Sequence, residues 1–214
     1  MKHPSTVMLR TIRVFSDLPE HALEKVSKAC DVRFYRPNML VMSQNAASSS
    51  VGFIVSGFIK LMRGDRQSPT NGYKDEDECD KRMLVDLLGP GESIGAASAL
   101  LGEEYSSSAI ALTPCSIVFV SSEFFVSLLR EIEGLSEQVM SILAKNVIAS
   151  EKHAQLMNGD LKTRVFSIRN RCRQLGIDID RWLSNAEVAR MAGATRVAVS
   201  QIINREKQML KDLK

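Results

Sequence analysis

The sequence has few of the residues from which metal centres and catalytic sites are usually built. Its three histidines (His3, His21 and His153) lie far apart, and none stands in a nucleophile or metal-binding pattern. These absences argue against zinc, against an iron–sulfur cluster and against an enzyme, so no cofactor is expected. Scattered cysteines without a CxxC pair instead predict free thiols in a reducing cytoplasm. The cysteines are Cys30, Cys79, Cys115 and Cys172.

Long hydrophobic runs are absent as well. No apolar run approaches the roughly 20 residues that are needed to span a bilayer. The N-terminal residues 1–6 lead into Arg10 and Arg13 without an apolar signal region. We therefore expect a cytoplasmic protein with no membrane partner. The composition, with 44% hydrophobic and 25% charged residues, is that of an ordinary globular chain.

Charge is distributed unevenly along the chain. Residues 160–214 contain 12 Lys and Arg against 6 Asp and Glu, whereas residues 1–159 contain 16 against 19. A basic segment beside a mildly acidic one is what binding to a phosphate backbone requires, although a solvated helical surface has the same composition. The acidic run 75–80 has carboxylates for calcium but lacks the glycine of an EF-hand loop, which favours a solvated hairpin tip.

Residues 31–120 have the pattern of many short strands, preceded by a short helix near residues 19–29. Several segments alternate between apolar and polar residues, and turn signals such as Ser56-Gly57 and Gly89-Pro90-Gly91 separate them. Many short strands at this spacing predict a β-sandwich or jelly roll. The predicted strands are 32–35, 39–42, 51–55, 58–62, 82–88, 107–112 and 115–120.

Residues 122–157 change to helical periodicity, with a break at Gly134 and a long helix after it. A second apolar face (Met140, Leu143, Val147, Ile148) suggests that the helix packs on the sandwich as well as on a partner subunit. Two interleaved seven-residue repeats form an a/d seam, which predicts a two-stranded coiled coil and a homodimer. The seam residues are Leu135, Val139, Ile142, Asn146, Ala149, His153 and Leu156; Asn146 could set the register, and His153 either titrates across the seam or simply packs in it.

Residues 183–204 have the pattern of a helix-turn-helix. Ser184 can cap a first helix, and Glu187 completes a capping box. Gly193 stands where the chain must turn, and Thr195 can cap the second helix. An ordinary helical hairpin is the alternative. The second helix would bury Val199, Ile202 and Ile203 and leave Arg196, Ala198, Ser200 and Gln201 outward.

With strands, a seam helix and a helix-turn-helix in this order, the sequence resembles the Crp/Fnr family of bacterial transcription regulators over nearly its whole length. No single motif carries the resemblance, which depends on their order and spacing. Members are homodimers with a jelly-roll sensor domain and a winged-helix DNA reader. The matching segments are residues 14–18, 53–61, 89–95, 111–115, 150–152 and 195–200.

The resemblance implies an α+β fold in three parts. Residues 1–130 would form a β jelly roll of the cyclic-nucleotide-binding type, residues 131–158 the dimerisation helix, and residues 159–214 a helix-turn-helix DNA-binding domain. The chain stops at Lys214, and the β-hairpin wing that normally follows is missing. Either the module lacks a wing or the sequence is a truncated form.

The effector pocket that the resemblance implies departs from the family pattern. Cyclic-nucleotide-binding members place a Glu on the ribose and an Arg on the cyclic phosphate, where this sequence has Ala96 and Tyr105. A phosphate among neutral groups loses a charge-assisted contact worth roughly 1.5–3 kcal/mol. We therefore expect the effector not to be cyclic AMP, which leaves a different ligand or none. The pocket positions are Gly95, Ala96, Tyr105, Ser106, Ala149 (the adenine-contacting position) and Ser150.

The predicted reading helix keeps Arg196, which can bond guanine O6 and N7 in two places. Gln201 suits adenine, and the methyl groups of Val197 or Ala198 suit the methyl group of thymine. Val197 and Gln201 replace the acidic and basic residues that commonly follow, so the DNA site should differ from the usual family consensus. Contacts to phosphate are expected from Ser184, Asn185, Thr195 and Ser200.

The resulting prediction is a homodimeric, sequence-specific DNA-binding transcription regulator. Its two reading helices, residues 195–204 of each subunit, would enter major grooves about 34 Å apart and select a near-palindromic site. The implied partners are double-stranded DNA, a second copy of the chain, RNA polymerase and an unidentified small-molecule effector. The missing wing suggests an alternative, a ligand-binding or protein-binding regulator without productive DNA binding.

Overall fold

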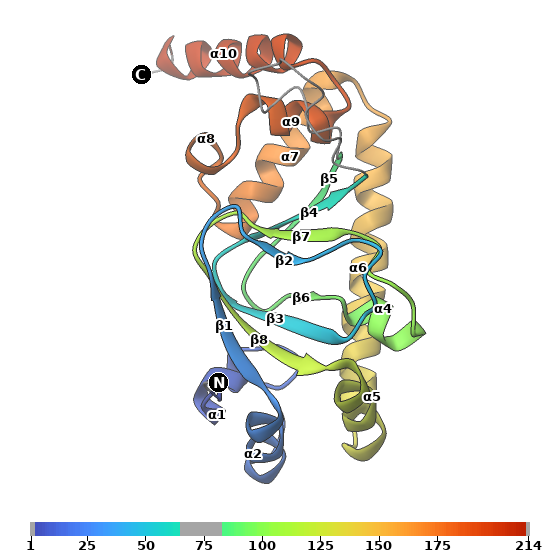
Figure 1. Cartoon of the computed structure of the whole chain (residues 1–214). Helices are drawn as coiled ribbons and strands as arrows, with labels where there is room; N and C mark the ends of the chain where they lie inside the picture. Colours follow the sequence, from blue (N-terminus) through green and yellow to red (C-terminus); the bar gives the residue numbers. More distant parts are fainter. Residues whose placement is uncertain (1–2, 65–82, 213–214) are drawn as a thin grey trace, which may run out of the picture. The chain divides into compact units, whose positions relative to one another are not determined.

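The computed structural model describes residues 3–64 and 83–212, and the predicted acidic run 75–80 and Cys79 lie outside them. The chain divides into two compact units (Figure 1). Unit 1 contains residues 1–63 and 86–146, and unit 2 contains residues 64–85 and 147–214. The three domain boundaries expected from the sequence stay a prediction. Within the described ranges, no helix combines the length and the apolar character needed to cross a bilayer.

Two four-stranded antiparallel sheets form the β-sandwich, which confirms the predicted β architecture. Each predicted strand coincides with an observed strand within one residue at each end. The first sheet has the order β1 (Asp31–Tyr35), β8 (Cys115–Ser121), β3 (Ser50–Ser56) and β6 (Ser93–Ile94). The second has the order β2 (Leu40–Met42), β7 (Ser108–Ala111), β4 (Ile59–Arg63) and β5 (Met83–Leu88).

Strand β8 shows why the sandwich buries so much apolar surface. Its residues Ile117 and Phe119 face the space between the two sheets, in a core with residues of β2, β4 and β7. Its residues Val118 and Val120 face the other way, into a core formed with the helices of unit 1. A strand buried on both faces is expected to be apolar almost throughout, as β8 is.

The helices of unit 1 cover the outer face of the first sheet. Phe53 of β3 lies at the centre of this contact, with its ring centroid 4.8 Å from that of Phe15 and 5.8 Å from that of Phe125. Only the helices near residues 20 and 125 were expected from the sequence, because the others are too short to show periodicity. The covering helices are α1 (Thr6–Arg10), α2 (Glu20–Ala29), α4 (Ala96–Leu101) and α5 (Ser122–Glu131).

The long helix α6 (Leu135–Met157) begins after Gly134, which has a φ of 79° in the turn between α5 and α6. Leu135 and Val139 are buried in the core of unit 1. These two residues of the predicted seam are therefore covered within their own chain and offer no surface to a partner subunit. The other described seam residues lie half-buried or exposed on the same helix: Ile142, Asn146, Ala149 and Leu156. The exposed apolar residues next to them are Met140, Val147 and Ile148.

Unit 2 is built on helices that contact one another around a small apolar core. The Asp160 carboxylate accepts a hydrogen bond from the Thr163 amide at 2.8 Å, which caps the first of these helices. Its core consists of Val165, Ile168, Cys172, Val188, Ala189, Ala192, Val199 and Ile203. The helices are α7 (Leu161–Leu175), α8 (Ile179–Trp182), α9 (Asn185–Ala192) and α10 (Arg196–Asp212).

Candidate nucleic-acid interface and ligand cradle

Helix α9 begins with the capping box that the sequence predicts. The Ser184 hydroxyl accepts a hydrogen bond from the Glu187 amide at 3.2 Å, and the Glu187 carboxylate accepts one from the Ser184 amide at 2.9 Å. Gly193 ends the helix with a φ of 58°, a left-handed conformation that glycine adopts without strain. The chain then enters α10, where the Thr195 hydroxyl accepts from the Ala198 amide at 3.3 Å.

A hydrogen bond between side chains joins α9 to α10. The amide nitrogen of Asn185 donates to the Ser200 hydroxyl at 3.0 Å, and both residues are half-buried. Ala189 is buried nearby in the core, where its small side chain allows close approach of the helices. Asn185 and Ser200 therefore hold the crossing of the two helices, a role that the sequence did not indicate.

Helix α10 has one buried and one exposed side. Val199 and Ile203 are buried, and Ile202 is half-buried. Arg196, Val197 and Gln201 are exposed, whereas Ala198 is half-buried, so Val197 rather than Ala198 is the outward apolar residue. The same exposed side continues at Asn204 and Arg205, which sequence reasoning missed. Their spacing of seven and eight residues from Val197 could have identified them.

Arg169 ties three helices of unit 2 together. Its Nε lies 3.3 Å from a carboxylate oxygen of Glu206 in α10, and its Nη1 lies 4.0 Å from Asp180 in α8. The side chain of Arg169 is 17% exposed and that of Glu206 is 31% exposed, so this closer pair is partly shielded from water, whereas Asp180 is 53% exposed. Helix α10, whose other side is exposed, is thus held in place by contacts with the rest of unit 2.

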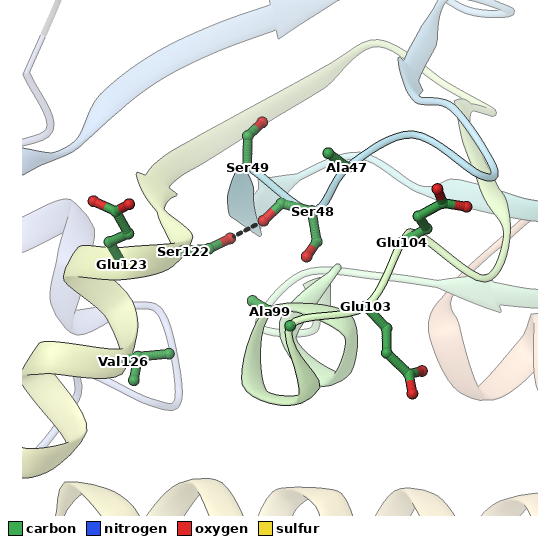
Figure 2. A pocket seen from close by; sticks show the side chains of 10 residues that line it. Ala47, Ser48, Ser49, Ala99, Glu103, Glu104, Ser122, Glu123 and Val126 are labelled. Atoms are coloured by element: carbon green, nitrogen blue, oxygen red, sulfur yellow. Dashed lines mark hydrogen bonds between the residues drawn. The ribbon is translucent and has the colours of Figure 1, made fainter.

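Unit 1 contains an open hollow of about 610 Å³ between α4, α5 and the segment before β3 (Figure 2). Three carboxylates surround it, those of Glu103, Glu104 and Glu123. The Ser122 hydroxyl donates to the Ser48 carbonyl at 2.5 Å and closes one side. None of the predicted pocket residues lines this hollow. Its negative charge would repel a cyclic phosphate.

Two of the predicted pocket residues, Gly95 and Tyr105, lie in contact with each other. Gly95 has a φ of 78° and precedes α4. A Cβ added there would lie 2.7 Å from Cε1 of Tyr105 and 3.1 Å from the Ser50 carbonyl oxygen. The ring therefore packs directly against bare backbone, and Tyr105 is only 6% exposed.

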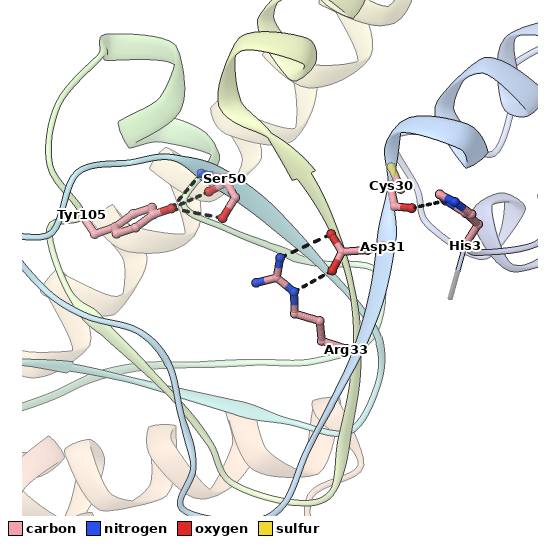
Figure 3. Close-up of polar contacts among 6 residues, drawn as sticks. All are labelled: His3, Cys30, Asp31, Arg33, Ser50 and Tyr105. Atoms are coloured by element: carbon pink, nitrogen blue, oxygen red, sulfur yellow. Dashed lines mark hydrogen bonds and ion pairs between the residues drawn. The ribbon is translucent and has the colours of Figure 1, made fainter. Parts of the chain in front are cut away.

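The phenol of Tyr105 is hydrogen-bonded to both backbone groups of Ser50, the amide and the carbonyl (Figure 3). It donates to the Ser50 carbonyl at 2.6 Å and accepts from the Ser50 amide at 3.1 Å. The backbone of Tyr105 also pairs with Asn45 and Ala46 at 2.9 and 3.0 Å. The Tyr105 side chain is thus held both by hydrogen bonds to Ser50 and by packing against Gly95.

The predicted pocket lacks the arginine of the family pattern. Strand β1 carries an arginine, Arg33, but its charge is already neutralised by Asp31. Its Nε donates to Asp31 at 2.6 Å (Figure 3), and its guanidinium lies 4.5 Å from the centroid of the Phe119 ring. The Asp31 carboxylate, as the main cause, raises the pKa of Arg33 above its usual value. Arg33 is therefore engaged in an ion pair rather than presented to an anion.

Comparison with known proteins shows what this chain is similar to. The cyclic nucleotide-binding domain family matches residues 32–131. The chain is 25% identical over 173 residues to the cyclic AMP receptor protein of Thermus thermophilus, covering 80% of this chain and 74% of that protein. It is 26% identical over 191 residues to the global nitrogen regulator of Nostoc sp., covering 84% and 80%.

The solved structure of FixK2 from Bradyrhizobium japonicum has the same fold, with a TM-score of 0.66 at 15% identity over 84% of this chain and 85% of that one. That structure shows the fold alone, while the matched domain and the two named relatives show what the chain is similar to. The chain is Crp/Fnr-like.

The remaining predicted pocket residues of this Crp/Fnr-like chain belong to different elements. Ala96 is buried at the start of α4, and Ser106 is exposed, with its carbonyl accepting from Nε of Arg63 at 3.2 Å. Ala149 and Ser150 are exposed on the part of α6 that belongs to unit 2. Their grouping with Gly95 in one pocket stays a prediction.

The described thiols of the Crp/Fnr-like chain are buried, and burial disfavours their thiolate form. Burial raises the pKa of Cys30 to about 12 and that of Cys172 to about 11, and it also raises the pKa of Cys115. In residues 3–64 and 83–212, no cluster of three or more His, Cys, Asp or Glu side chains is placed to hold a metal ion.

Proposed function

We propose that this Crp/Fnr-like chain is a sequence-specific DNA-binding transcription regulator that acts as a homodimer. The observation that carries the proposal is the exposed side of α10, which begins at a capped turn after α9 and lies in a segment with 12 Lys and Arg against 6 Asp and Glu. A braced helix with an exposed N-terminal turn and positive surroundings suits entry into a major groove. Its relative in Nostoc is named a global nitrogen regulator.

Each reading helix would approach DNA with its first residues. Arg196 would bond guanine O6 and N7, while Ser184 and Thr195 would contact phosphates from the turn. Two copies held by α6 would place the helices about 34 Å apart and select a near-palindrome. The exposed apolar residues Val147 and Ile148 of α6 support association with a second copy, because exposed apolar surface is buried on dimerisation.

Arg196→Ala tests this function. We expect the variant to remain a dimer in sedimentation and to lose roughly 5- to 150-fold preference for the selected operator over random duplex, the value of one bidentate base contact. Arg173→Ala is the matched control, since it removes an exposed arginine of unit 2 outside α10. Equal operator preference in wild type and Arg196→Ala would show that this assignment is wrong.

A salt series separates this function from its alternative. Binding through several phosphates must weaken steeply as the salt concentration rises. If wild type shows no affinity for duplex DNA at low salt, the chain is a regulator that binds a ligand or protein without productive DNA binding.

We also propose that cyclic AMP is not the effector. The Tyr105 ring occupies the place beside Gly95, and neutral Ala96 replaces the ribose-binding acid of the family pattern. We expect calorimetric titration of the full chain with cyclic AMP to give no binding heat, and DNA affinity to be the same with and without the nucleotide. A saturable heat, or a nucleotide-dependent change in DNA affinity, would overturn this proposal.

A further inference from the structure

Three exposed side chains form a single row along α10. Val197, Gln201 and Asn204 follow one another at intervals of four and three residues, which places them on one side of an α-helix. Val197 is 67% exposed, and the opposite side of the helix carries buried Val199 and Ile203. The row therefore faces solvent over about two helical turns.

The row is neutral, and charge lies beside it. At about 100° per residue, Arg196 lies roughly 100° to one side of Val197 and Arg205 roughly 80° to the other. Both arginines are exposed. The apolar group and the two amides match the hydrogen-bonding base edges on the floor of a major groove, with Arg196 beside them for guanine and Arg205 towards a phosphate wall.

We propose that Val197, Gln201 and Asn204 read A·T base pairs in the major groove, and that Asn204 is a specificity residue. This inference rests on the proposed DNA-binding function. Asn and Gln form two hydrogen bonds with adenine N6 and N7, and a Val methyl group packs against the thymine methyl group. Gln201 and Asn204 are about 4.5 Å apart along the helix axis, close to one base step of 3.4 Å, so they address neighbouring pairs.

The same row is a poor fit for a protein groove. A helix that docks in an apolar groove carries apolar anchors at i, i+3 or i+4, and i+7. Here only the first of these positions is apolar, since Gln201 and Asn204 occupy the next two. The basic balance of residues 160–214 adds to the preference for a polyanion.

The contacts that hold α10 in place do not involve the row. Asn185 bonds Ser200, and Arg169 pairs with Glu206, both away from the three reading side chains. Substitutions in the row should therefore leave the fold intact, so a change in base preference can be assigned to lost base contacts.

The test is selection of bound sequences from a random duplex library with the full chain. Wild type should enrich half-sites in which A·T pairs occupy two neighbouring positions beside a G·C pair. Asn204→Ala should lower the preference at one A·T position by roughly 5- to 150-fold, and Gln201→Ala should do so at its neighbour. Asn204→Asp should move the preference at the same position to cytosine, because the N4 amino group of cytosine donates a hydrogen bond to a carboxylate.

Arg205→Ala is the matched control. It should weaken binding to all sequences alike and lower the salt slope by about 1, without changing base preference. If wild type binds no duplex DNA, the proposed function fails. If wild type binds and the Asn204 and Gln201 variants select the same sites as wild type, or if the neighbouring positions are not A·T, this inference fails and the proposed function stands.

Discussion

Tyr105 connects three segments that are distant in the sequence. Its ring packs on Gly95, its hydroxyl bonds both the amide and the carbonyl of Ser50, and its backbone pairs with residues 45 and 46. The ring fills interior volume, and the hydroxyl satisfies the backbone amide and carbonyl of Ser50. Tyr105 thus closes the space between Gly95 and Ser50, which we call the cradle, and stabilises the sandwich around it.

Tyr105→Ala should lower the free energy of unfolding by about 3–5 kcal/mol, the usual cost of truncating a large buried ring. Urea unfolding measures this change. Since the vacated space has the shape of a phenol, millimolar p-cresol should raise the unfolding midpoint of the variant but not that of wild type.

Tyr35→Ala is the control for this result, because Tyr35 is only half-buried. Its ring is tilted against that of Phe119, with the ring centroids 6.2 Å apart, and it has no enclosing cradle. We expect p-cresol to leave its midpoint unchanged. Equal effects of p-cresol on both variants would mean that the space left by Tyr105 is not a specific cradle.

The element with the most local definition is α9 together with the turn into α10. Its start is closed by the Ser184–Glu187 capping box and its end by left-handed Gly193. Both signals act within a few residues, so they hold whatever surrounds them. The crossing of the two helices depends instead on the Asn185–Ser200 bond, which joins residues 15 positions apart.

Ser184→Ala should destabilise unit 2 by about 0.5–2 kcal/mol, because the first amides of α9 lose their acceptor. Ser184→Gly should cost only a few tenths of a kcal/mol, since glycine is tolerated at this position. Thermal unfolding followed by circular dichroism measures both. Equal destabilisation by alanine and glycine would contradict the capping role.

On the scale of the whole molecule, the buried thiols report on each unit separately. Cys30 and Cys115 belong to unit 1, and Cys172 belongs to unit 2. Burial raises the pKa of all three thiols. Above pH of about 8.5, the unfolded chain loses thiol protons that the folded chain keeps, so stability is present below that pH and is lost as pH rises.

In a Cys79→Ser variant, we expect an aromatic disulfide reagent at pH 8 to label no thiol in the folded protein and all three in urea. The urea midpoint should fall between pH 8.5 and 10.5. Lysozyme, a protein without free thiols in its folded form, serves as the reagent control. Rapid labelling of the folded variant would contradict the burial of these thiols.

Local chemistry made much of this protein readable from its sequence. The strands, the capping box and the glycine turns depend on neighbours within a few residues, and they were predicted closely. Short elements such as α1, α4 and β6 were not predicted, because two to six residues cannot display a period.

Contacts between residues that are distant in the sequence could not be predicted in this way. The substitution of Tyr105 for an arginine was visible in the sequence, but its bond to Ser50, 55 positions away, was not. The burial of Leu135 and Val139 was not visible in the sequence either. Their heptad spacing suits contact with a partner helix as well as it suits the core of unit 1, in which they are buried. Periodicity tells which face of a helix is apolar; what covers that face depends on packing between segments distant in the chain, and only the folded arrangement specifies it.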